Sequence, residues 1–424
     1  MNMSSPTRKR VLMVAYHYPP EHSSSGVLRT LKFSKYLPEH GWDPVILTVR
    51  ENFYELTDPA LAAQIPPGVE VCRTRAIDTK KTLSIRGKYL RICAIPDRYV
   101  GWLPFAVRAG LKFVRSHRIQ ALYSTSPLAS AHLVASVLKS LTDLPWVADF
   151  RDPWTEPALA RKPGAPLFRL ECLLERHVLR HADRLVFTTA QLRDEMISRH
   201  KGVPESKTVV IPNGYDEEDF LALPETTPDP LPIRITHTGL VDGSYRSPRG
   251  FLEALGKLVQ SGEIAPSEVR VDFLGGGDYL RSTDFRSLIG RLRLESIVNI
   301  VDHLSYAECL KWQSRSHVLL LLQCGRDTLT LIPAKAFEYL RIGRPVLAVV
   351  PPSATAELFE RVGGARLVHP EDPAGMQAAL RELFAAARAE NWKSAVNRLA
   401  LQSYARRELT ARLAQTLDQL GGAN

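Results

Sequence analysis

The sequence is poor in cysteine and has no long apolar run. Five cysteines are scattered through 424 residues without a C-x-x-C pair, which indicates free thiols in a reducing cytoplasm and argues against a cysteine-based metal site. No apolar run approaches the roughly 18 residues of a membrane span. No Asp-x-Asp pair occurs anywhere, so the chain has no evident ligand set for a metal that bridges a diphosphate. We therefore expect neither a membrane span nor a bound metal.

Basic residues are concentrated in the first half of the chain. The formal net charge is +10, with 31 Lys and Arg against 19 Asp and Glu in residues 1–215, and 24 against 26 in residues 216–424. Residues 72–118 hold twelve basic and two acidic residues. The first half therefore faces or tolerates something anionic. Nucleic acid is not indicated, because there is no recognition-helix signature, zinc spacing or aromatic-studded basic strand.

Short apolar runs alternate with helical patterns along the chain, which predicts an α/β fold with parallel strands. The predicted strands cover residues 11–16, 44–49, 69–73, 121–124, 146–150, 184–188, 208–211, 233–237, 268–274, 297–301, 318–322 and 345–349. Residues 212–232 are rich in proline and predict a linker. Residues 375–420 are rich in Ala, Leu and Arg and are expected to be helical.

These patterns predict two Rossmann-like domains that face each other across a cleft. We expect an N-terminal domain at residues 1–211, the linker at 212–232 and a C-terminal domain at 233–400. Residues 401–424 are expected to form a C-terminal helix that packs back on the N-terminal domain.

The segment from Ile332 to Pro345 has the most informative pair of charges. It predicts a loop and a short helix after the buried strand at 318–322, the place where α/β proteins hold phosphate and ribose. Lys335 can meet a phosphate there, and Glu338, one helical turn later, can bridge two ribose hydroxyls. The alternative is an ordinary amphipathic βαβ unit with two surface charges.

Three further loops have glycines that allow close backbone approach to a ligand. The loop from His17 to Gly26 brings backbone N–H groups to a helix start and suits a diphosphate, but it is not a G-x-G-x-x-G dinucleotide motif. The loop after strand 233–237 contains Gly239 and Arg246, and Arg246 can grip two phosphate oxygens. Gly275 follows the next strand, where a planar base can lie against backbone. A mobile surface loop and a plain strand-to-helix turn remain the alternatives.

The sequence Asp149-Phe-Arg151-Asp152-Pro-Trp154 ends a strand of the first domain. Two carboxylates and an arginine at a strand end are typical of a cleft rather than of a core. The alternative is a local ion pair that closes a turn.

Taken together, four segments resemble family 4 of the retaining glycosyltransferases, which have the GT-B fold, in the subgroup with Asp-Phe-Arg-Asp-Pro-Trp. They are residues 16–26, residues 124–127 with 146–154, Ile211-Pro-Asn-Gly214, and residues 333–345. The resemblance implies transfer of a sugar from a nucleotide diphosphate with retention of configuration, in cell-surface polysaccharide or glycolipid synthesis. The N-terminal domain would receive the acceptor and the C-terminal domain the nucleotide-sugar.

The resemblance also assigns roles in donor binding. It places Glu338 on the donor ribose, Arg246 and Lys335 on the diphosphate, and Gly26 in the first-strand loop. Gly239 and Gly275 complete the expected donor site. The family often has a second glutamate eight positions before Glu338, where this chain has Thr330, so the donor sugar stays open. UDP is the commoner donor nucleotide, although nothing in the sequence excludes GDP.

Without a metal, fixed cations must stabilise the leaving nucleotide diphosphate, and Arg246 and Lys335 are the expected catalytic cations. Asp152 is the candidate to orient the acceptor, with His17, Asp149 and Arg151 as further acceptor candidates. No other cofactor is expected.

The block Lys80, Lys81, Arg86, Lys88 and Arg91, followed by Trp102, mixes cations with apolar side chains. This composition suits an anionic membrane surface and a glycan or lipid-linked acceptor. The alternative is a solvated basic face. We therefore expect a cytoplasmic protein, peripheral on the inner face of the cytoplasmic membrane. A sugar-nucleotide epimerase with the same fold and an inactive sugar-nucleotide or lipid binder are the competing functions.

Overall fold

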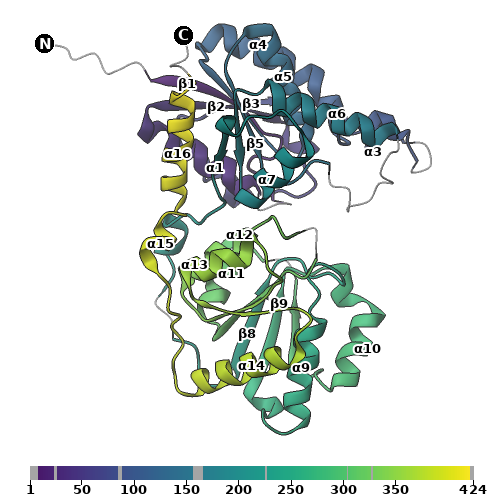
Figure 1. Cartoon of the computed structure of the whole chain (residues 1–424), viewed down its shortest axis with the longest axis vertical. Helices are drawn as coiled ribbons and strands as arrows, with labels where there is room; N and C mark the ends of the chain where they lie inside the picture. The colour runs from purple at the N-terminus through teal and green to yellow at the C-terminus, as the bar shows by residue number, and fades with distance from the viewer. Residues whose placement is uncertain are drawn as a thin grey trace, which may run out of the picture. The chain divides into compact units, whose positions relative to one another are not determined.

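A computed structural model describes residues 8–22, 26–84, 88–155, 166–224, 227–302, 304–325 and 328–420. The chain forms two compact units, one of Met1–Pro212 with Arg406–Asn424 and the other of Asn213–Ala405. Each unit contains a parallel sheet with flanking helices (Figure 1). The second unit begins inside the segment 212–232 that we predicted to be a linker.

The sheet of the first unit has the order β3-β2-β1-β4-β5-β6-β7, and its strand pairs are parallel. The strands are β1 (Lys9–Val14), β2 (Trp42–Val49), β3 (Glu70–Thr74), β4 (Ala121–Thr125), β5 (Trp146–Phe150), β6 (Arg184–Phe187) and β7 (Thr208–Val210). The helices are α1 (Gly26–Tyr36), α2 (Pro59–Ala62), α3 (Thr79–Thr82), α4 (Leu103–His117), α5 (Ala129–Thr142), α6 (Pro166–His181), α7 (Ala190–Arg199) and α16 (Arg406–Asp418). The central strands are apolar on both faces because helices cover both faces.

The C-terminal helix α16 belongs to the first unit. Its Leu409, Leu413 and Leu417 are buried in one core with β1, β2 and α1. Asp418, at its end, accepts a hydrogen bond from the Trp42 indole Nε1 at 3.0 Å and pairs with Lys9 at 2.8 Å. The predicted return of the C-terminal helix to the N-terminal domain is confirmed.

The sheet of the second unit has the order β10-β9-β8-β11-β12-β13 and is also parallel. The strands are β8 (Ile233–Thr238), β9 (Val269–Leu274), β10 (Val298–Val301), β11 (Val318–Leu322), β12 (Val346–Val349) and β13 (Ala365–Val368). The helices are α8 (Glu218–Leu221), α9 (Arg249–Gln260), α10 (Thr283–Leu292), α11 (Tyr306–Ser314), α12 (Ala334–Ile342), α13 (Ala354–Val362), α14 (Pro373–Arg388) and α15 (Arg398–Gln402).

The α/β prediction with two Rossmann-like domains is confirmed. Two details differ from the sequence analysis. The edge strand β13 was not predicted, and residues 375–420 do not form one helical block, because α14 and α15 belong to the second unit and α16 to the first.

Candidate functional site

The second unit reverses its strand order between β8 and β11, which are neighbours at the centre of the sheet. From β8 the chain adds β9 and β10 on one side, and from β11 it adds β12 and β13 on the other. Ligands of open α/β sheets bind at such a reversal, beyond the carboxyl ends of the strands. The loops after β8 and β11 contain Gly239, Arg246 and Thr330, and the helix α12 that follows the second loop begins with Lys335 in its first turn. All four are predicted donor residues.

Lys335 lies in the first turn of α12 and reaches the carboxyl end of β8. Its Nζ donates a hydrogen bond to the Thr238 carbonyl and lies 3.3 Å from Nε2 of His237. The Nδ1 of His237 is 2.9 Å from the Leu320 carbonyl, so Nδ1 is the protonated nitrogen and Nε2 faces Lys335 as an acceptor. Burial and the nearby Arg246 lower the pKa of Lys335 to about 7. The ammonium therefore titrates near neutral pH.

Glu338 lies one turn further along α12 and is buried, whereas Lys335 is partly buried. Burial raises the pKa of Glu338 to about 7, against a hydrogen bond from Tyr306 that lowers it. Lys335 and Glu338 thus occupy one face of the helix start, as the spacing predicts. Each is held in a site that disfavours its charge, which is typical of a functional site rather than of a solvated surface.

Glycine turns follow β8 and β9 in direct contact with each other. Gly239 and Gly275 have φ values of 91° and 104°. A Cβ on Gly275 would lie 3.1 Å from the Gly239 Cα, and a Cβ on Gly239 would lie 3.1 Å from Nζ of Lys335. The structure therefore brings Gly239, Gly275 and Lys335 together.

The two arginines of the β8–α9 loop have different surroundings. Arg246 is half-buried and close enough to disfavour a charge on Lys335. Arg249 instead pairs with Asp284 at 3.3 Å and with Glu253 at 3.8 Å.

Thr330 lies in the loop between β11 and α12, and that loop is anchored just after it. The Leu331 carbonyl accepts hydrogen bonds from Gln323 at 3.1 Å and from Thr355 at 3.0 Å. Thr330 thus occupies a fixed loop at the same sheet edge as Lys335.

In the first unit the reversal of strand order lies between β1 and β4. Arg151, after β5, donates hydrogen bonds to the carbonyls of Gly26 at 3.2 Å and Ser126 at 3.0 Å. A Cβ on Gly26 would lie 2.0 Å from the Arg151 guanidinium. Gly26 and Arg151 therefore meet at the edge of the sheet. Burial raises the pKa of Asp152, against the lowering effect of Arg151.

Asp149 is a structural residue, which corrects its prediction as an acceptor contact. It is fully buried, and Arg29 donates two hydrogen bonds to it, each of 2.8 Å. The hydroxyls of Tyr123 and Thr125 donate to the same carboxylate at 2.6 and 2.9 Å. Burial raises the pKa of Asp149, but the Arg29 guanidinium outweighs burial and holds it below its usual value. The ion pair is not the local one that the alternative predicted, because its partner Arg29 is 120 residues away in the sequence.

Arg29 is an important residue that the sequence analysis missed. Besides holding Asp149, it donates to the backbone carbonyls of Ile211 and Pro212 at 2.9 and 2.8 Å. It therefore connects α1 with β5 and with the segment Ile211–Pro212. No pattern in the sequence marks it.

His17 lies after β1 and contacts a buried acid. Its Nδ1 is 3.2 Å from the carboxylate of Glu21, whose side chain is 1% exposed. His17 is thus held in position at the carboxyl edge of the sheet, where it remains an acceptor candidate.

The predicted basic block is exposed where the structure describes it. Lys80, Lys81, Lys88 and Arg91 are exposed, and Arg86 lies outside the described residues. Apolar neighbours are exposed as well, with Leu83, Leu90 and Ile92 at 51%, 75% and 58%. Trp102 is different, because it is fully buried and its indole Nε1 donates to Thr74 at 2.7 Å. Its prediction as a membrane contact is wrong.

The described residues contain neither a metal-ligand cluster nor a membrane-spanning helix. They contain no group of three or more His, Cys, Asp or Glu side chains placed to hold a metal ion. They also contain no helix with the length and hydropathy needed to cross a bilayer.

Comparison with known proteins identifies a domain in the first unit. Residues 26–214 match the family model of the glycosyl transferase 4-like domain. No curated protein sequence matches the chain. The matched residues make up most of the first unit, which is therefore similar to this domain.

Solved structures match the whole chain. A sucrose-phosphate synthase from Thermosynechococcus elongatus has a TM-score of 0.67 at 16% identity, covering 98% of this chain and 100% of that chain. HepE of Anabaena in complex with UDP-glucose has a TM-score of 0.64 at 14% identity, covering 97% and 100%. A UDP-N-acetylglucosamine 2-epimerase has a TM-score of 0.55 at 12% identity, covering 98% of each. At these identities the likeness establishes the fold alone. The chain thus shares the fold of these proteins, and its residues 26–214 are similar to the glycosyl transferase 4-like domain.

Proposed function

We propose that this protein is a retaining glycosyltransferase of family 4, in the subgroup with Asp-Phe-Arg-Asp-Pro-Trp. It moves a sugar, of hexosyl type, from a nucleotide diphosphate to a glycan or lipid-linked acceptor. One observation carries the proposal. Partly buried Lys335 and buried Glu338 share the start of α12, beside the glycine turns of Gly239 and Gly275, at the strand-order reversal of the second unit.

The proposed chemistry is electrostatic. Lys335 and Arg246 bind the donor diphosphate and stabilise the negative charge that develops as the nucleotide leaves. Glu338 accepts hydrogen bonds from the ribose hydroxyls. The backbone of Gly239 and Gly275 allows the nucleotide to approach, and Thr330 lies near the transferred sugar. Because these residues supply the positive charge, the reaction needs no metal. A UDP-sugar is the favoured donor, in keeping with the UDP-glucose complex of HepE.

The first unit receives the acceptor in this proposal. Asp152 orients the acceptor hydroxyl, with Arg151 and His17 beside it at the carboxyl edge of the sheet. The exposed cations from Lys80 to Arg91 lie among exposed leucines, which supports peripheral binding to an anionic membrane in cell-surface polysaccharide or glycolipid synthesis. Binding to phosphatidylglycerol vesicles, but not to phosphatidylcholine vesicles, tests this part. It should weaken with salt and when Lys80, Lys81, Lys88 and Arg91 are neutralised.

The experiment for the main proposal has two stages. Thermal unfolding against a panel of sugar nucleotides identifies the donor, because a ligand at one hundred times its Kd stabilises the folded state by about 2.7 kcal/mol. Nuclear magnetic resonance of the product formed from that donor then reads the anomeric configuration. An inverted product would contradict the retaining mechanism, and absence of stabilisation by any sugar nucleotide would contradict the donor site.

The same experiment tests the competing function. The likeness to a UDP-N-acetylglucosamine 2-epimerase favours an epimerase as the second candidate. An epimerase would change the stereochemistry of the nucleotide-sugar without an acceptor, whereas a transferase requires one. An inactive binder would be stabilised by the nucleotide-sugar and would form no product.

A further inference from the structure

Three arginines lie on one face of helix α6. Arg169, Arg176 and Arg180 follow one another at intervals of seven and four residues, and the intervening Cys172 and Leu173 lie on the same face. The buried residues of α6, such as Glu175 and Val178, occupy another face. Within the described part of the chain, no hydrogen bond or ion pair engages the side chains of Arg169 and Arg176.

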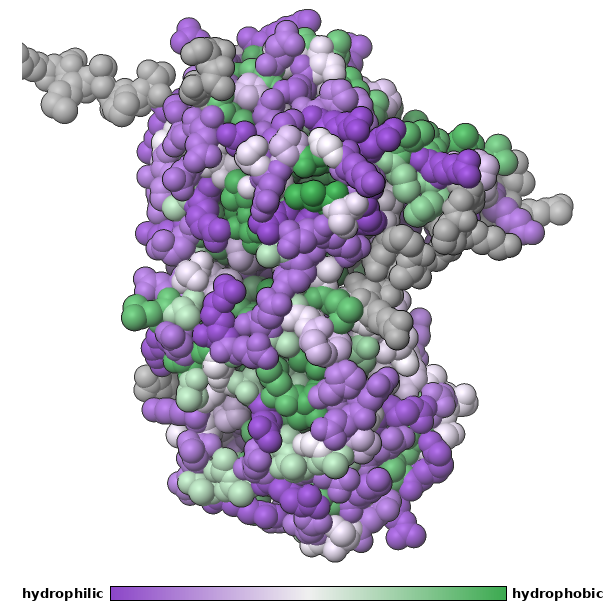
Figure 2. Space-filling view, viewed as in Figure 1, coloured by the Kyte–Doolittle hydropathy of each residue, from purple (hydrophilic) through white to green (hydrophobic). Residues whose placement is uncertain are grey.

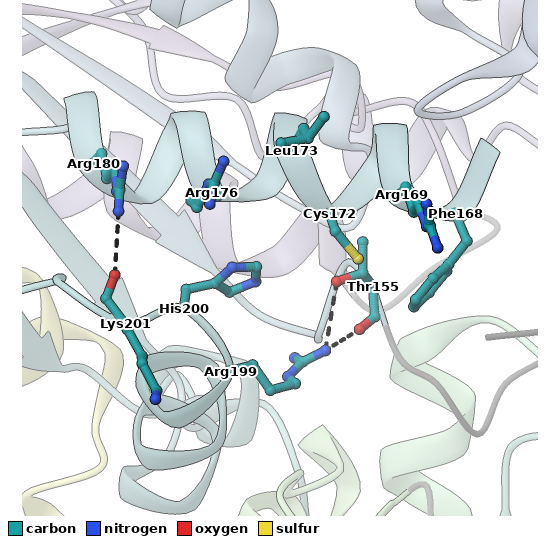
Figure 3. Close-up of a pocket in the computed structure, with 10 residues that line it drawn as sticks. All are labelled: Thr155, Phe168, Arg169, Cys172, Leu173, Arg176, Arg180, Arg199, His200 and Lys201. Carbon is teal, nitrogen blue, oxygen red and sulfur yellow. Dashed lines mark hydrogen bonds between the residues drawn. The ribbon is translucent and has the colours of Figure 1, made fainter. Parts of the chain in front are cut away.

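This face of α6 forms one wall of a cavity of about 820 Å³. The opposite wall is the segment Arg199–Lys201, at the C-terminal end of α7 (Figure 3). Arg180 donates a hydrogen bond to the Lys201 carbonyl at 3.3 Å and so connects the two walls. Five cations line the cavity, namely Arg169, Arg176, Arg180, Arg199 and Lys201, and none of its ten described lining residues is acidic.

A buried acid that does not itself line the cavity contacts two of its lining residues, Thr155 and His200. The carboxylate of Glu175 is 2.6 Å from Nε2 of His200 and accepts hydrogen bonds from the backbone and hydroxyl of Thr155. Burial raises the pKa of Glu175, but His200 and Thr155 outweigh burial and hold it below its usual value. Arg199 donates to the Thr155 carbonyl and is 3.6 Å from Glu195. These contacts fix Thr155, Arg199 and His200 in the cavity lining. Among the five lining cations, only Arg199 has an ion pair within the described residues.

The cavity also has an apolar part. Phe168, Cys172 and Leu173 line it together with the arginines, and Leu173 is 50% exposed. Figure 2 shows apolar and polar residues mixed over α6. A volume of about 820 Å³ is in the range of pockets that hold an organic ligand and exceeds what a bare phosphate fills.

We propose that this cavity is a binding site for a phosphate or diphosphate group carried by an organic molecule with an apolar portion. The arginines supply forked donors for phosphate oxygens, and Phe168 and Leu173 contact the apolar portion. The phosphate group can belong to a lipid headgroup or to a soluble organic phosphate, and both offer the arginines the same phosphate oxygens. The site lies wholly in the first unit, and the proposal does not depend on the proposed function.

Cys172 provides a local readout. Its alkylation rate by iodoacetamide, followed by peptide mass spectrometry, should fall about tenfold when the ligand is present at about ten times its Kd. Inorganic diphosphate is the soluble probe and phosphatidylglycerol vesicles are the lipid probe. Sodium chloride of equal ionic strength and phosphatidylcholine vesicles are their controls. The half-buried Cys72 on β3 reports whether the first unit stays folded.

The test variant is Arg169→Gln/Arg176→Gln. Each lost charge-assisted contact weakens binding about tenfold, so protection should vanish at the same probe concentration. The matched control, Arg286→Gln/Arg291→Gln, removes two exposed arginines from α10, and protection should persist there.

Each outcome decides the proposal. Protection by diphosphate that depends on Arg169 and Arg176 supports it with a soluble source, and protection by phosphatidylglycerol alone supports it with a lipid headgroup. Protection by neither probe, equal protection by sodium chloride, or undiminished protection in the double variant would overturn it. Without the probes, donor binding by the second unit should be the same in Arg169→Gln/Arg176→Gln as in the wild type, which separates failure here from failure of the proposed function.

Discussion

Replacing Lys335 by methionine tests the proposed donor site most directly. Methionine keeps an unbranched side chain of similar length on α12 but removes the ammonium that contacts Thr238 and His237. A charge-assisted hydrogen bond to a diphosphate contributes about 1.5–3 kcal/mol. Donor affinity should therefore fall between about tenfold and a hundredfold. Loss of a cation that stabilises the leaving group should lower the rate by about a hundredfold.

The fold should tolerate this change. Burial already disfavours the charge on Lys335, since its pKa is lowered to about 7, so the folded protein gains little from the ammonium itself. We expect the free energy of unfolding to change by less than about 1.5 kcal/mol, as for volume-conserving core substitutions. Lys257→Met, an exposed lysine on α9, is the matched control.

The pH dependence gives a signature that is specific to Lys335. A diphosphate favours the protonated ammonium, so wild-type donor affinity should fall as the pH rises through about 7, the pKa of Lys335 without ligand. In Lys335→Met this alkaline fall should disappear. Isothermal titration calorimetry of the donor from pH 6 to pH 8.5, with the transfer rate measured in parallel, provides the test. Unchanged affinity and turnover in Lys335→Met would refute the reasoning.

Three further predictions concern the donor, the metal and the first unit. Glu338→Ala should weaken donor binding through lost ribose hydrogen bonds, and wild-type affinity should fall below about pH 7, where Glu338 becomes protonated; a calorimetric Kd equal to wild type would contradict the ribose role. Transfer should survive excess EDTA, and a loss that magnesium or manganese restores would contradict the metal-free reaction. Asp149→Asn should destabilise the first unit by about 3–5 kcal/mol because it leaves buried Arg29 without its carboxylate. Urea unfolding should show this loss, whereas the exposed Asp194→Asn should change little.

The fold could be predicted because buried parallel strands have a strong sequence signal. Apolar runs such as Val318–Leu322 are bounded by helices and turns, and the structure has a strand at each predicted run. The strand β13 escaped because Ala365–Val368 is short, lies at the sheet edge and contains the exposed Arg366. A strand at the edge of a sheet is only partly buried, so it does not need a continuous run of apolar residues.

The two units differ in how far the sequence could predict their buried charged residues. Lys335 and Glu338 are three residues apart on one helix, so their common face follows from helix geometry. Arg29 and Asp149 are 120 residues apart, and only the completed sheet brings them together. Trp102 was misjudged because an aromatic residue beside a basic block has the same local pattern whether it is buried or exposed.

The distribution of charge explains why the donor anion is proposed for the second unit. The first half of the chain has the basic excess, yet its buried Arg29 is neutralised by Asp149. Residues 216–424 hold more acidic than basic residues, 26 against 24, so a cation at their sheet edge does not reflect a general basic bias. In the described part of the chain, no carboxylate lies within ion-pair distance of Lys335. A partly buried amine that lacks a carboxylate partner and lies beside glycine backbone at a strand-order reversal is suited to an anionic ligand. The nucleotide diphosphate that we propose as the donor would supply that negative charge.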